Sequence, residues 1–191
     1  MSFYGYICTA MTEFNRLQTI KRRLFAMRNG IIADTLRKAG SPYRIIFGVN
    51  LPQLSEIASE IGKDLELATV LWDNKSTRES RMIAPMIFPL EHLTAEKASE
   101  MFADTDSTEV MDILCHKLLR QTTFSSDLIA ANINSPSPLH RYGALRLLWW
   151  TIEECPERAL ELAQNEFSRD CPMTKMVARQ IIDEVEFIQG N

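Results

Sequence analysis

The segment DSTEVMDILCHKLL, residues 106–119, combines an apolar stripe at helical spacing with a polar side that carries ionisable groups. Glu109, Asp112, His116 and Arg120 lie around that polar side. A carboxylate, an imidazole and a guanidinium on one helix face are groups that can carry charge or exchange protons. Spacing alone predicts that Asp112 is a solvent-exposed aspartate whose neighbour one turn later is His116.

The cysteines and histidines form no recognisable site. They are Cys8, Cys115, Cys155 and Cys171, and His92, His116 and His140. No two cysteines form a C-x-x-C pair, which argues against a zinc site and against a disulfide framework. The histidines lack H-E-x-x-H or a similar ligand spacing. We therefore expect reduced thiols and no metal site.

The charge balance limits the kinds of partner. The formal net charge is −4 and the pI is near 5.5, so the whole protein is not the strongly basic body of a nonspecific nucleic-acid binder. A local basic surface stays open as a hypothesis. Its candidates form three clusters, which are Lys21, Arg22 and Arg23 with Arg28, then Arg37 with Lys38, and then Arg78 with Arg81. The alternative is that each cluster is a solvated helix face.

The size and hydropathy of the chain predict a single helical-repeat domain over residues 1–191. The sequence is 46% hydrophobic and 24% charged, which suffices for a sizeable core. No apolar run approaches the roughly 18 to 20 residues that span a bilayer. The first ten residues, MSFYGYICTA, lack the charged start and long apolar centre of a secretory signal. We expect a cytoplasmic protein without a membrane partner.

The pattern predicts an almost entirely α-helical protein, because alternating runs of β-branched residues are short. We expect helices over about 11–28, 30–39, 52–61, 63–73, 77–88, 94–103, 107–120, 126–133, 138–152, 156–168 and 173–188, with boundary errors of roughly 2 to 4 residues. Pro52 and Gly62 mark the start and end of one helix, and Thr94 and Ser107 occupy N-cap positions. These helices suit stacked antiparallel pairs better than a compact bundle.

The expected pairs cover about 52–73, 77–103, 107–133 and 138–168. Apolar residues cover most of the circumference of the helix over 138–152, which is typical of a helix between neighbours. Gly143 there permits a close approach. Trp149 and Trp150 point about 100° apart, so we expect at least one in the core rather than both in a ligand-stacking platform.

One long segment resembles a known family. It is YRIIFGVNLPQLSEIASEIGKDLELATVLWDNKSTRESRMIAPMIFP, residues 43–89. The matching features, in order, are Phe47-Gly48-Val49, Leu51-Pro52, Leu67-Ala68, Leu71-Trp72, Arg78-Glu79, Arg81 and Ala84. The segment resembles the bacterial DNA alkylation repair (AlkD-like) HEAT-repeat family, and the remaining chain follows the helical rhythm of that family. The resemblance implies an all-α fold, a right-handed superhelix of stacked antiparallel helix pairs of the HEAT-like or ARM type.

The same segment also has a purely structural interpretation. Gly48 permits a turn, and residues 74–76 join two helices. Arg78 or Arg81 pairs with a neighbouring helix end, while Pro85 bends the helix in which it lies.

The resemblance implies hydrolysis of the N-glycosidic bond of a cationic alkylated purine in duplex DNA, without a metal or cofactor. Asp112 matches the catalytic aspartate of the family, which stabilises the sugar cation. A tryptophan is expected one turn earlier, where this chain has Thr108. Arg141 matches an arginine that contacts the DNA backbone, and its alternative role is an ion pair with a carboxylate on an adjacent helix. The C-terminal helix lacks tryptophan and tyrosine, and Phe187 comes too late to match the last aromatic of the family.

Two functions follow. The first is a DNA-binding alkylation-repair protein. Such a protein can also be an alkylpurine DNA glycosylase, with Asp112 as its catalytic carboxylate. The second is a noncatalytic HEAT-like scaffold whose concave face binds DNA, RNA or another protein, and it is favoured by the acidic pI and the absent aromatics. A basic groove favours nucleic acid, whereas a groove of mixed charge favours the scaffold.

Overall fold

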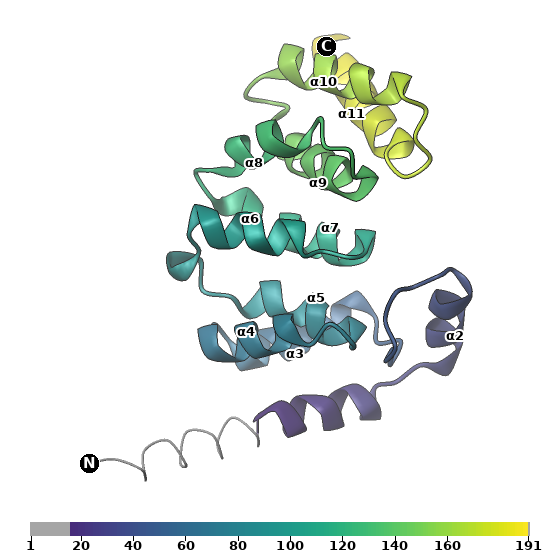
Figure 1. Cartoon of the computed structure of the whole chain (residues 1–191), viewed down its shortest axis with the longest axis vertical. Helices are drawn as coiled ribbons and strands as arrows, with labels where there is room; N and C mark the ends of the chain where they lie inside the picture. The colour runs from purple at the N-terminus through teal and green to yellow at the C-terminus, as the bar shows by residue number, and fades with distance from the viewer. Residues whose placement is uncertain (1–15, 191) are drawn as a thin grey trace. The chain divides into compact units, whose positions relative to one another are not determined.

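The computed structural model describes residues 16–190, which divide into two compact units (Figure 1). Unit 1 covers Met1–His92 and unit 2 covers Leu93–Asn191. Single-domain organisation over residues 1–191 stays a prediction. The first expected helix is observed over residues 16–26, and its residues 11–15 lie outside the described range, as do Cys8 and the segment MSFYGYICTA.

The all-α fold is confirmed, with eleven α-helical segments within residues 16–190. Unit 1 contains the helix over 16–26, α2 (Gly30–Lys38), α3 (Leu51–Ile61), α4 (Leu65–Asp73), α5 (Arg78–Ile87) and the 3-10 turn η1 (Leu90–His92). Unit 2 contains α6 (Ala95–Ala103), α7 (Thr108–Lys117), η2 (Leu119–Gln121), α8 (Ser125–Asn132), α9 (Pro138–Leu148), η3 (Trp149–Thr151), α10 (Pro156–Ser168) and α11 (Lys175–Gly190). The handedness of a superhelix stays a prediction.

Local capping explains where these helices begin and end. The side chains of Thr94 and Ser107 accept hydrogen bonds from backbone N–H groups of the first turns of α6 and α7, as expected. Gly62 ends α3 with a φ of 73°. The capping box at the start of α3 was not predicted. In it, the Asn50 side chain accepts a hydrogen bond from the Gln53 N–H at 3.0 Å, and the Gln53 side chain accepts one from the Asn50 N–H at 3.3 Å.

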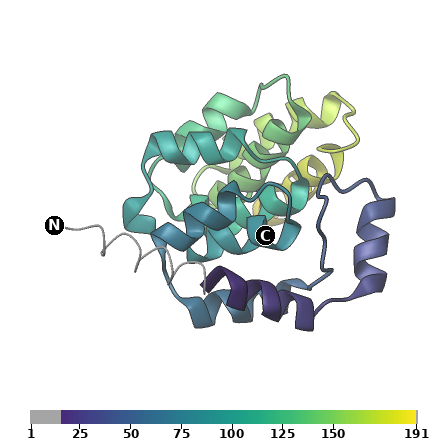
Figure 2. The ribbon, with the colours of Figure 1, turned by 60° about the horizontal axis from the view of Figure 1, so that its bottom comes forward.

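The stretch between α2 and α3 packs on the start of α5 (Figure 2). The N–H of Ile45 donates to the Ser76 carbonyl at 2.8 Å, and the Arg78 N–H donates to the Ile45 carbonyl at 3.1 Å. Gly48 has a φ of 75°, and a Cβ there would lie 2.2 Å from the Asn29 carbonyl oxygen. Only glycine suits this turn, so its structural interpretation is confirmed.

A buried ionic cluster ties this stretch to α5. The Glu79 carboxylate accepts from the Gly48 N–H at 3.0 Å, and the Arg78 guanidinium donates to it at 3.0 Å. The Arg81 guanidinium donates to the Trp72 carbonyl at 2.8 Å, near the end of α4, and stacks 3.8 Å from the Trp72 ring centroid. The expected pairing with a neighbouring helix end is therefore observed.

This cluster corrects the nucleic-acid role expected for two arginines. Arg78 is 5% exposed and Arg81 has no exposed area, and both bind groups of their own unit. A phosphate cannot reach a side chain enclosed in this way, so both arginines serve the fold. Pro85 lies inside α5 as expected, and the bend stays a prediction.

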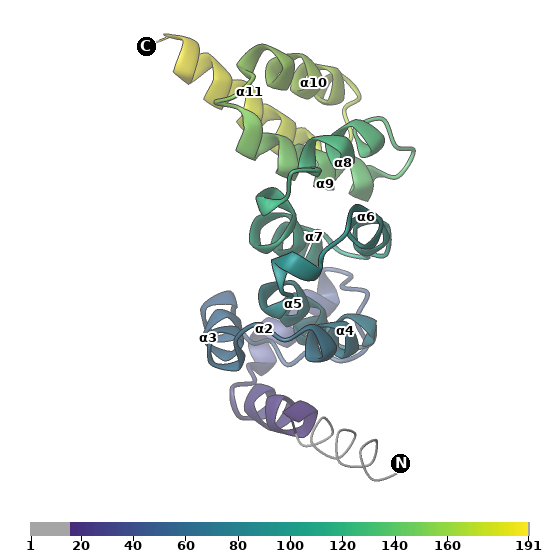
Figure 3. The same cartoon turned by 90° about the vertical axis from the view of Figure 1, so that its left-hand side faces the viewer.

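In unit 2 the helices pack as α10 on α11, α8 on α9 and α7 on α9 (Figure 3). The prediction paired α7 with α8 over 107–133 and α9 with α10 over 138–168. The observed partners are therefore shifted by one helix from the predicted ones. Short turns follow almost every helix, and they do not reveal which apolar faces meet. Gly143 confirms the expected close approach, because a Cβ there would lie 2.5 Å from the Phe102 ring and 2.6 Å from the Met111 sulfur.

Within residues 16–190, no helix is both long enough and apolar enough to span a bilayer.

Candidate functional site

Asp112 lies on α7, with its carboxylate directed toward α9 of the same unit. The apolar side of α7 holds the helix in place, since Val110, Met111 and Leu114 are fully buried. Asp112 itself stands at the edge of that side, and 36% of its side chain is exposed. The carboxylate is thus partly desolvated and still accessible.

Two side chains of α9 hold the Asp112 carboxylate. The Arg146 Nε donates to Oδ1 at 2.7 Å, and the Tyr142 hydroxyl lies 2.9 and 3.1 Å from the two carboxylate oxygens. Tyr142 and Arg146 are four residues apart, so they share one face of their helix. This arrangement replaces the expected solvent-exposed aspartate beside His116.

Burial dominates the electrostatics of this carboxylate. Desolvation raises the pKa of Asp112 above the usual value of an aspartate, although the Arg146 charge and the Tyr142 hydrogen bond act in the opposite direction. Burial and the Asp112 charge together raise the pKa of Tyr142, so its hydroxyl stays a hydrogen-bond donor at neutral pH. The group therefore consists of the Asp112 carboxyl, the Arg146 cation and the neutral Tyr142 phenol.

His116 and Arg120 contact an indole instead of Asp112. The rings of His116 and Trp150 have centroids 5.2 Å apart, and the Arg120 guanidinium lies 4.0 Å from the Trp150 centroid. Burial lowers the pKa of His116, and the nearby positive charges of Arg120, Lys117 and Arg146 lower it further. The histidine is therefore neutral at pH 7.

A hollow of about 540 Å³ adjoins the Asp112 group through Arg146. Its lining residues are Arg146, Trp149, Trp150, Gln180, Asp183 and Glu184. The expectation of a tryptophan in the core is wrong, since Trp149 is half-buried and Trp150 is 44% exposed. Both tryptophans belong to the 3-10 turn that follows α9, and both line this hollow. The charge of the hollow is mixed rather than basic.

Arg141 has the alternative role considered for it. Its Nε donates to both carboxylate oxygens of Glu166 on α10, at 2.9 and 3.0 Å, and its Nη1 donates to the Ser135 carbonyl at 2.9 Å. Arg141 is 7% exposed and Glu166 is 1% exposed. Because its donors are occupied inside the unit, the structure gives Arg141 a packing role in place of the expected DNA contact.

The basic cluster of the helix over 16–26 divides into two parts. The Arg23 Nη2 donates to the Glu60 carboxylate on α3 at 3.0 Å. Lys21 and Arg22 are exposed and line a second hollow, of about 570 Å³, together with Arg44. Unit 1 thus offers a basic surface made by Lys21, Arg22 and Arg44.

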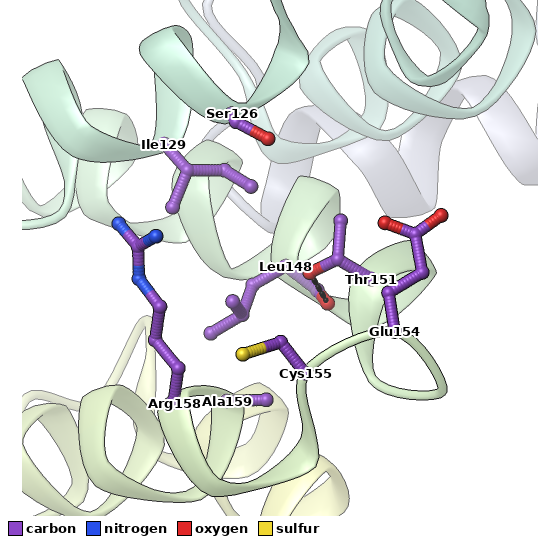
Figure 4. A pocket seen from close by; sticks show the side chains of 8 residues that line it. All are labelled: Ser126, Ile129, Leu148, Thr151, Glu154, Cys155, Arg158 and Ala159. Carbon is purple, nitrogen blue, oxygen red and sulfur yellow. Dashed lines mark hydrogen bonds between the residues drawn. The ribbon is translucent and has the colours of Figure 1, made fainter.

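Unit 2 also contains a second, much smaller hollow, with a volume of about 80 Å³ (Figure 4). Cys155 and Arg158 line it from the start of α10, opposite Ile129 of α8. Ligand sites usually measure about 300 to 1,000 Å³. This hollow is too small for a nucleobase. Among the residues that the structure describes, no three acidic, histidine or cysteine side chains are grouped as metal ligands.

Tyr142 and Arg146 were not predicted from the sequence as residues of the site. Their spacing of four residues indicated a shared helix face, but nothing in the sequence indicated that this face meets Asp112. Arg141, five residues before Arg146, carried the family resemblance instead.

The sequence of this chain matches the family described as DNA alkylation repair enzyme over residues 20–190. Comparison with curated proteins gave no match, and comparison with solved structures gave none. The family match covers most of the chain and agrees with the resemblance found over residues 43–89. The chain belongs to the DNA alkylation repair enzyme family.

Proposed function

We propose that this protein binds duplex DNA and hydrolyses the N-glycosidic bond of cationic N-alkylated purines, with Asp112 as the catalytic carboxylate. Membership of a DNA alkylation repair family gives the chain a DNA repair-like role. One observation carries the finer proposal: a half-buried carboxylate, held by two side chains, adjoins a hollow that contains two tryptophans.

In the proposed reaction, the bond between the sugar C1′ and the purine nitrogen breaks, and its electron pair leaves with the base. The base thereby loses its positive charge, and the sugar becomes an oxocarbenium ion. The Asp112 carboxylate stabilises this cation electrostatically. A water molecule then adds to C1′ and releases a proton to the solvent. The reaction requires an ionised Asp112.

Arg146 and Tyr142 are positioning residues for this carboxylate. Their hydrogen bonds fix its orientation at distances of 2.7 to 3.1 Å. The charge of Arg146 also favours the ionised form, which burial alone disfavours.

Trp150 supplies the aromatic face for the cationic base. An indole attracts a cation by roughly 0.5 to 2 kcal/mol, depending on desolvation. In the free protein the Arg120 guanidinium occupies this face, 4.0 Å from the ring centroid. Arg120 is exposed, so a cationic base can replace it. Trp150 thus compensates for the aromatic that is absent at Thr108.

Lys21 and Arg22 are the proposed phosphate contacts, with Arg23 as a weaker one because it is paired with Glu60. Arg78, Arg81 and Arg141 are excluded from this interface by their burial.

The test is release of 7-methylguanine from methylated duplex DNA. We expect release by the wild type and a loss of about 100-fold or more in Asp112→Asn, because the stabilising charge is removed. Asp127→Asn is the matched control, since Asp127 is an exposed aspartate of α8. Equal release by the wild type and Asp112→Asn, or no release at high wild-type concentration, contradicts the proposal.

A second candidate function is a noncatalytic HEAT-like scaffold that binds nucleic acid or another protein. The observation that favours it is the mixed charge of the 540 Å³ hollow in unit 2, which is lined by Arg146, Asp183 and Glu184. A scaffold that binds DNA has an affinity that falls steeply with salt, and it releases no base. A scaffold for proteins alone shows no DNA affinity even at low salt.

A further inference from the structure

The unit 1 hollow is built by three separate segments. The helix over 16–26 contributes Lys21, Arg22 and Phe25, the stretch before α3 contributes Arg44 and Phe47, and the joint before α5 contributes Asn74. The contacts of Ile45 with the joint hold two of these segments together. Its volume of about 570 Å³ lies within the usual range of a ligand site.

Among residues 16–190, the charged side chains that line this hollow are all positive. Lys21, Arg22 and Arg44 are exposed, and no carboxylate from these described residues lines the hollow. Other arginines of the unit differ, because Arg23 and Arg37 pair with Glu60 and Asp34. Within residues 16–190 the three cations of the hollow form no such ion pair. Unpaired cations that converge on a hollow favour an anionic ligand.

The hollow also contains aromatic surface. Phe25 is 56% exposed although it is a large apolar residue, and Phe47 is half-buried beside it. The Arg28 guanidinium lies 3.9 Å from the Phe25 centroid and adds one more positive charge nearby. Positive charge combined with an exposed aromatic ring is the pattern by which proteins bind single-stranded nucleic acid.

We infer that the unit 1 hollow binds a nucleotide of single-stranded DNA. Its phosphates contact Lys21, Arg22 and Arg44, and its unstacked base lies against Phe25. A base inside a duplex is stacked on both sides and cannot contact the ring, so the Phe25 contact requires an unpaired base. The phosphates of duplex DNA can still contact Lys21 and Arg22, so the cations serve both forms of DNA. This inference rests on the DNA-binding part of the proposed function and does not depend on base excision.

Fluorescence anisotropy of a labelled oligothymidylate of about ten nucleotides, with the full chain at low salt, tests the phosphate contacts. We expect the double variant Arg22→Gln, Arg44→Gln to bind at least about tenfold more weakly than the wild type. Lys38→Gln is the matched control, since Lys38 is an exposed cation of α2 outside the hollow. Its affinity should stay within about twofold. Wild-type affinity in the double variant, or equal weakening in the control, overturns the inference.

A second comparison tests the aromatic contact. Phe25→Ala should weaken binding of the oligothymidylate about five- to tenfold, and Phe25→Trp should restore it. On an abasic strand of equal length, Phe25→Ala should have no effect. Equal losses on both strands contradict base stacking. Circular dichroism verifies that each variant keeps its helical content.

The two proposals fail separately. Asp112→Asn should bind the single strand like the wild type, whatever its base release. Absence of 7-methylguanine release with intact single-strand binding contradicts the glycosylase proposal alone. Release of base without single-strand affinity contradicts the unit 1 site alone.

Discussion

The basic hollow of unit 1 and the 540 Å³ hollow of unit 2 differ in the neighbours of their arginines. In unit 1, Arg22 and Arg44 line a hollow to which residues 16–190 contribute no carboxylate. In unit 2, Arg146 binds Asp112 and faces further acidic side chains across a hollow of similar size. The first environment suits an anion, and the second suits a cation beside a fixed carboxylate. The neighbours of an arginine, rather than its presence, determine what its site can bind.

Each unit also contains an enclosed arginine. The Arg81 Nη1 in unit 1 donates to the Trp72 carbonyl, and the Arg141 Nε in unit 2 donates to the Glu166 carboxylate. Burying a guanidinium without such partners costs several kcal/mol. These residues therefore provide an internal standard for a purely structural role.

The largest effect is expected for Arg141→Met. The change leaves the Glu166 carboxylate buried without its main partner, so the free energy of unfolding should fall by about 3 to 5 kcal/mol. Urea unfolding followed by circular dichroism measures this difference. Arg146→Met is the matched control and should cost about 1 kcal/mol or less, because the Arg146–Asp112 pair is about one-third exposed. Similar costs for the two variants would remove the distinction between the buried and the accessible arginine.

The next largest effect concerns the pH dependence of base release. In the proposed reaction only the ionised carboxylate stabilises the sugar cation, so release should fall as the pH drops through the pKa of Asp112. Burial raises that pKa above its usual value of about 3.9, so the loss begins at a higher pH than for an exposed aspartate. Arg146→Gln removes a charge that lowers the pKa, and the acid limb should move to still higher pH.

The test is to measure the rate of 7-methylguanine release between about pH 4 and pH 8. At neutral pH we expect the rate of Arg146→Gln to be about tenfold lower than that of the wild type. Lys117→Gln serves as a control because Lys117 is not a partner of Asp112. An acid limb that stays in place in Arg146→Gln would show that Arg146 does not act through Asp112.

A smaller effect is expected for the salt dependence of single-strand binding. A plot of log affinity against log salt has a slope of about −0.7 for each phosphate contact. The double variant Arg22→Gln, Arg44→Gln should therefore flatten the slope by about 1.4. Arg146→Gln should leave it unchanged. Flattening by the unit 2 variant instead would assign the phosphate contacts to the other hollow.

The smallest effect is expected for Tyr142→Phe. The variant removes one hydroxyl that donates to Asp112 and should lower the free energy of unfolding by about 0.5 to 1.5 kcal/mol. The acid limb of base release should move upward by less than in Arg146→Gln, since the Arg146 charge has the larger effect on the pKa. A larger shift in Tyr142→Phe would reverse the order of the two positioning residues.

Helix positions were largely predictable, because capping and breaking residues act on their own turns. Gly62, Thr94 and Ser107 mark boundaries whose signals lie within four residues, and the structure has them there. The partners of charged residues were not predictable in the same way. Arg78 precedes Glu79 in the chain, yet the burial of this pair depends on the turn at Gly48, some thirty residues earlier.

The candidate site shows the same limit. The resemblance selected Asp112 and Arg141, but the structure joins Asp112 to Arg146 and joins Arg141 to Glu166. Arg141 and Arg146 lie five residues apart on α9 and have different ion-pair partners. Assigning the site role to Arg141 instead of Arg146 therefore changes both the expected partner and the expected function. Helix periodicity predicts which residues share a face, and it contains no information about the helix that this face contacts.

The sequence by itself determined the all-α class, the places where helices begin and end, and membership of the DNA alkylation repair enzyme family. These properties depend on local turns and on ordered motifs along the chain. Only the tertiary structure decided which arginines are enclosed and which remain accessible, and it brought Arg146 to Asp112 and both tryptophans to the surface. The reason is physical: burial and ion pairing arise where faces of distant helices meet, and their energies depend on that contact rather than on the residue alone.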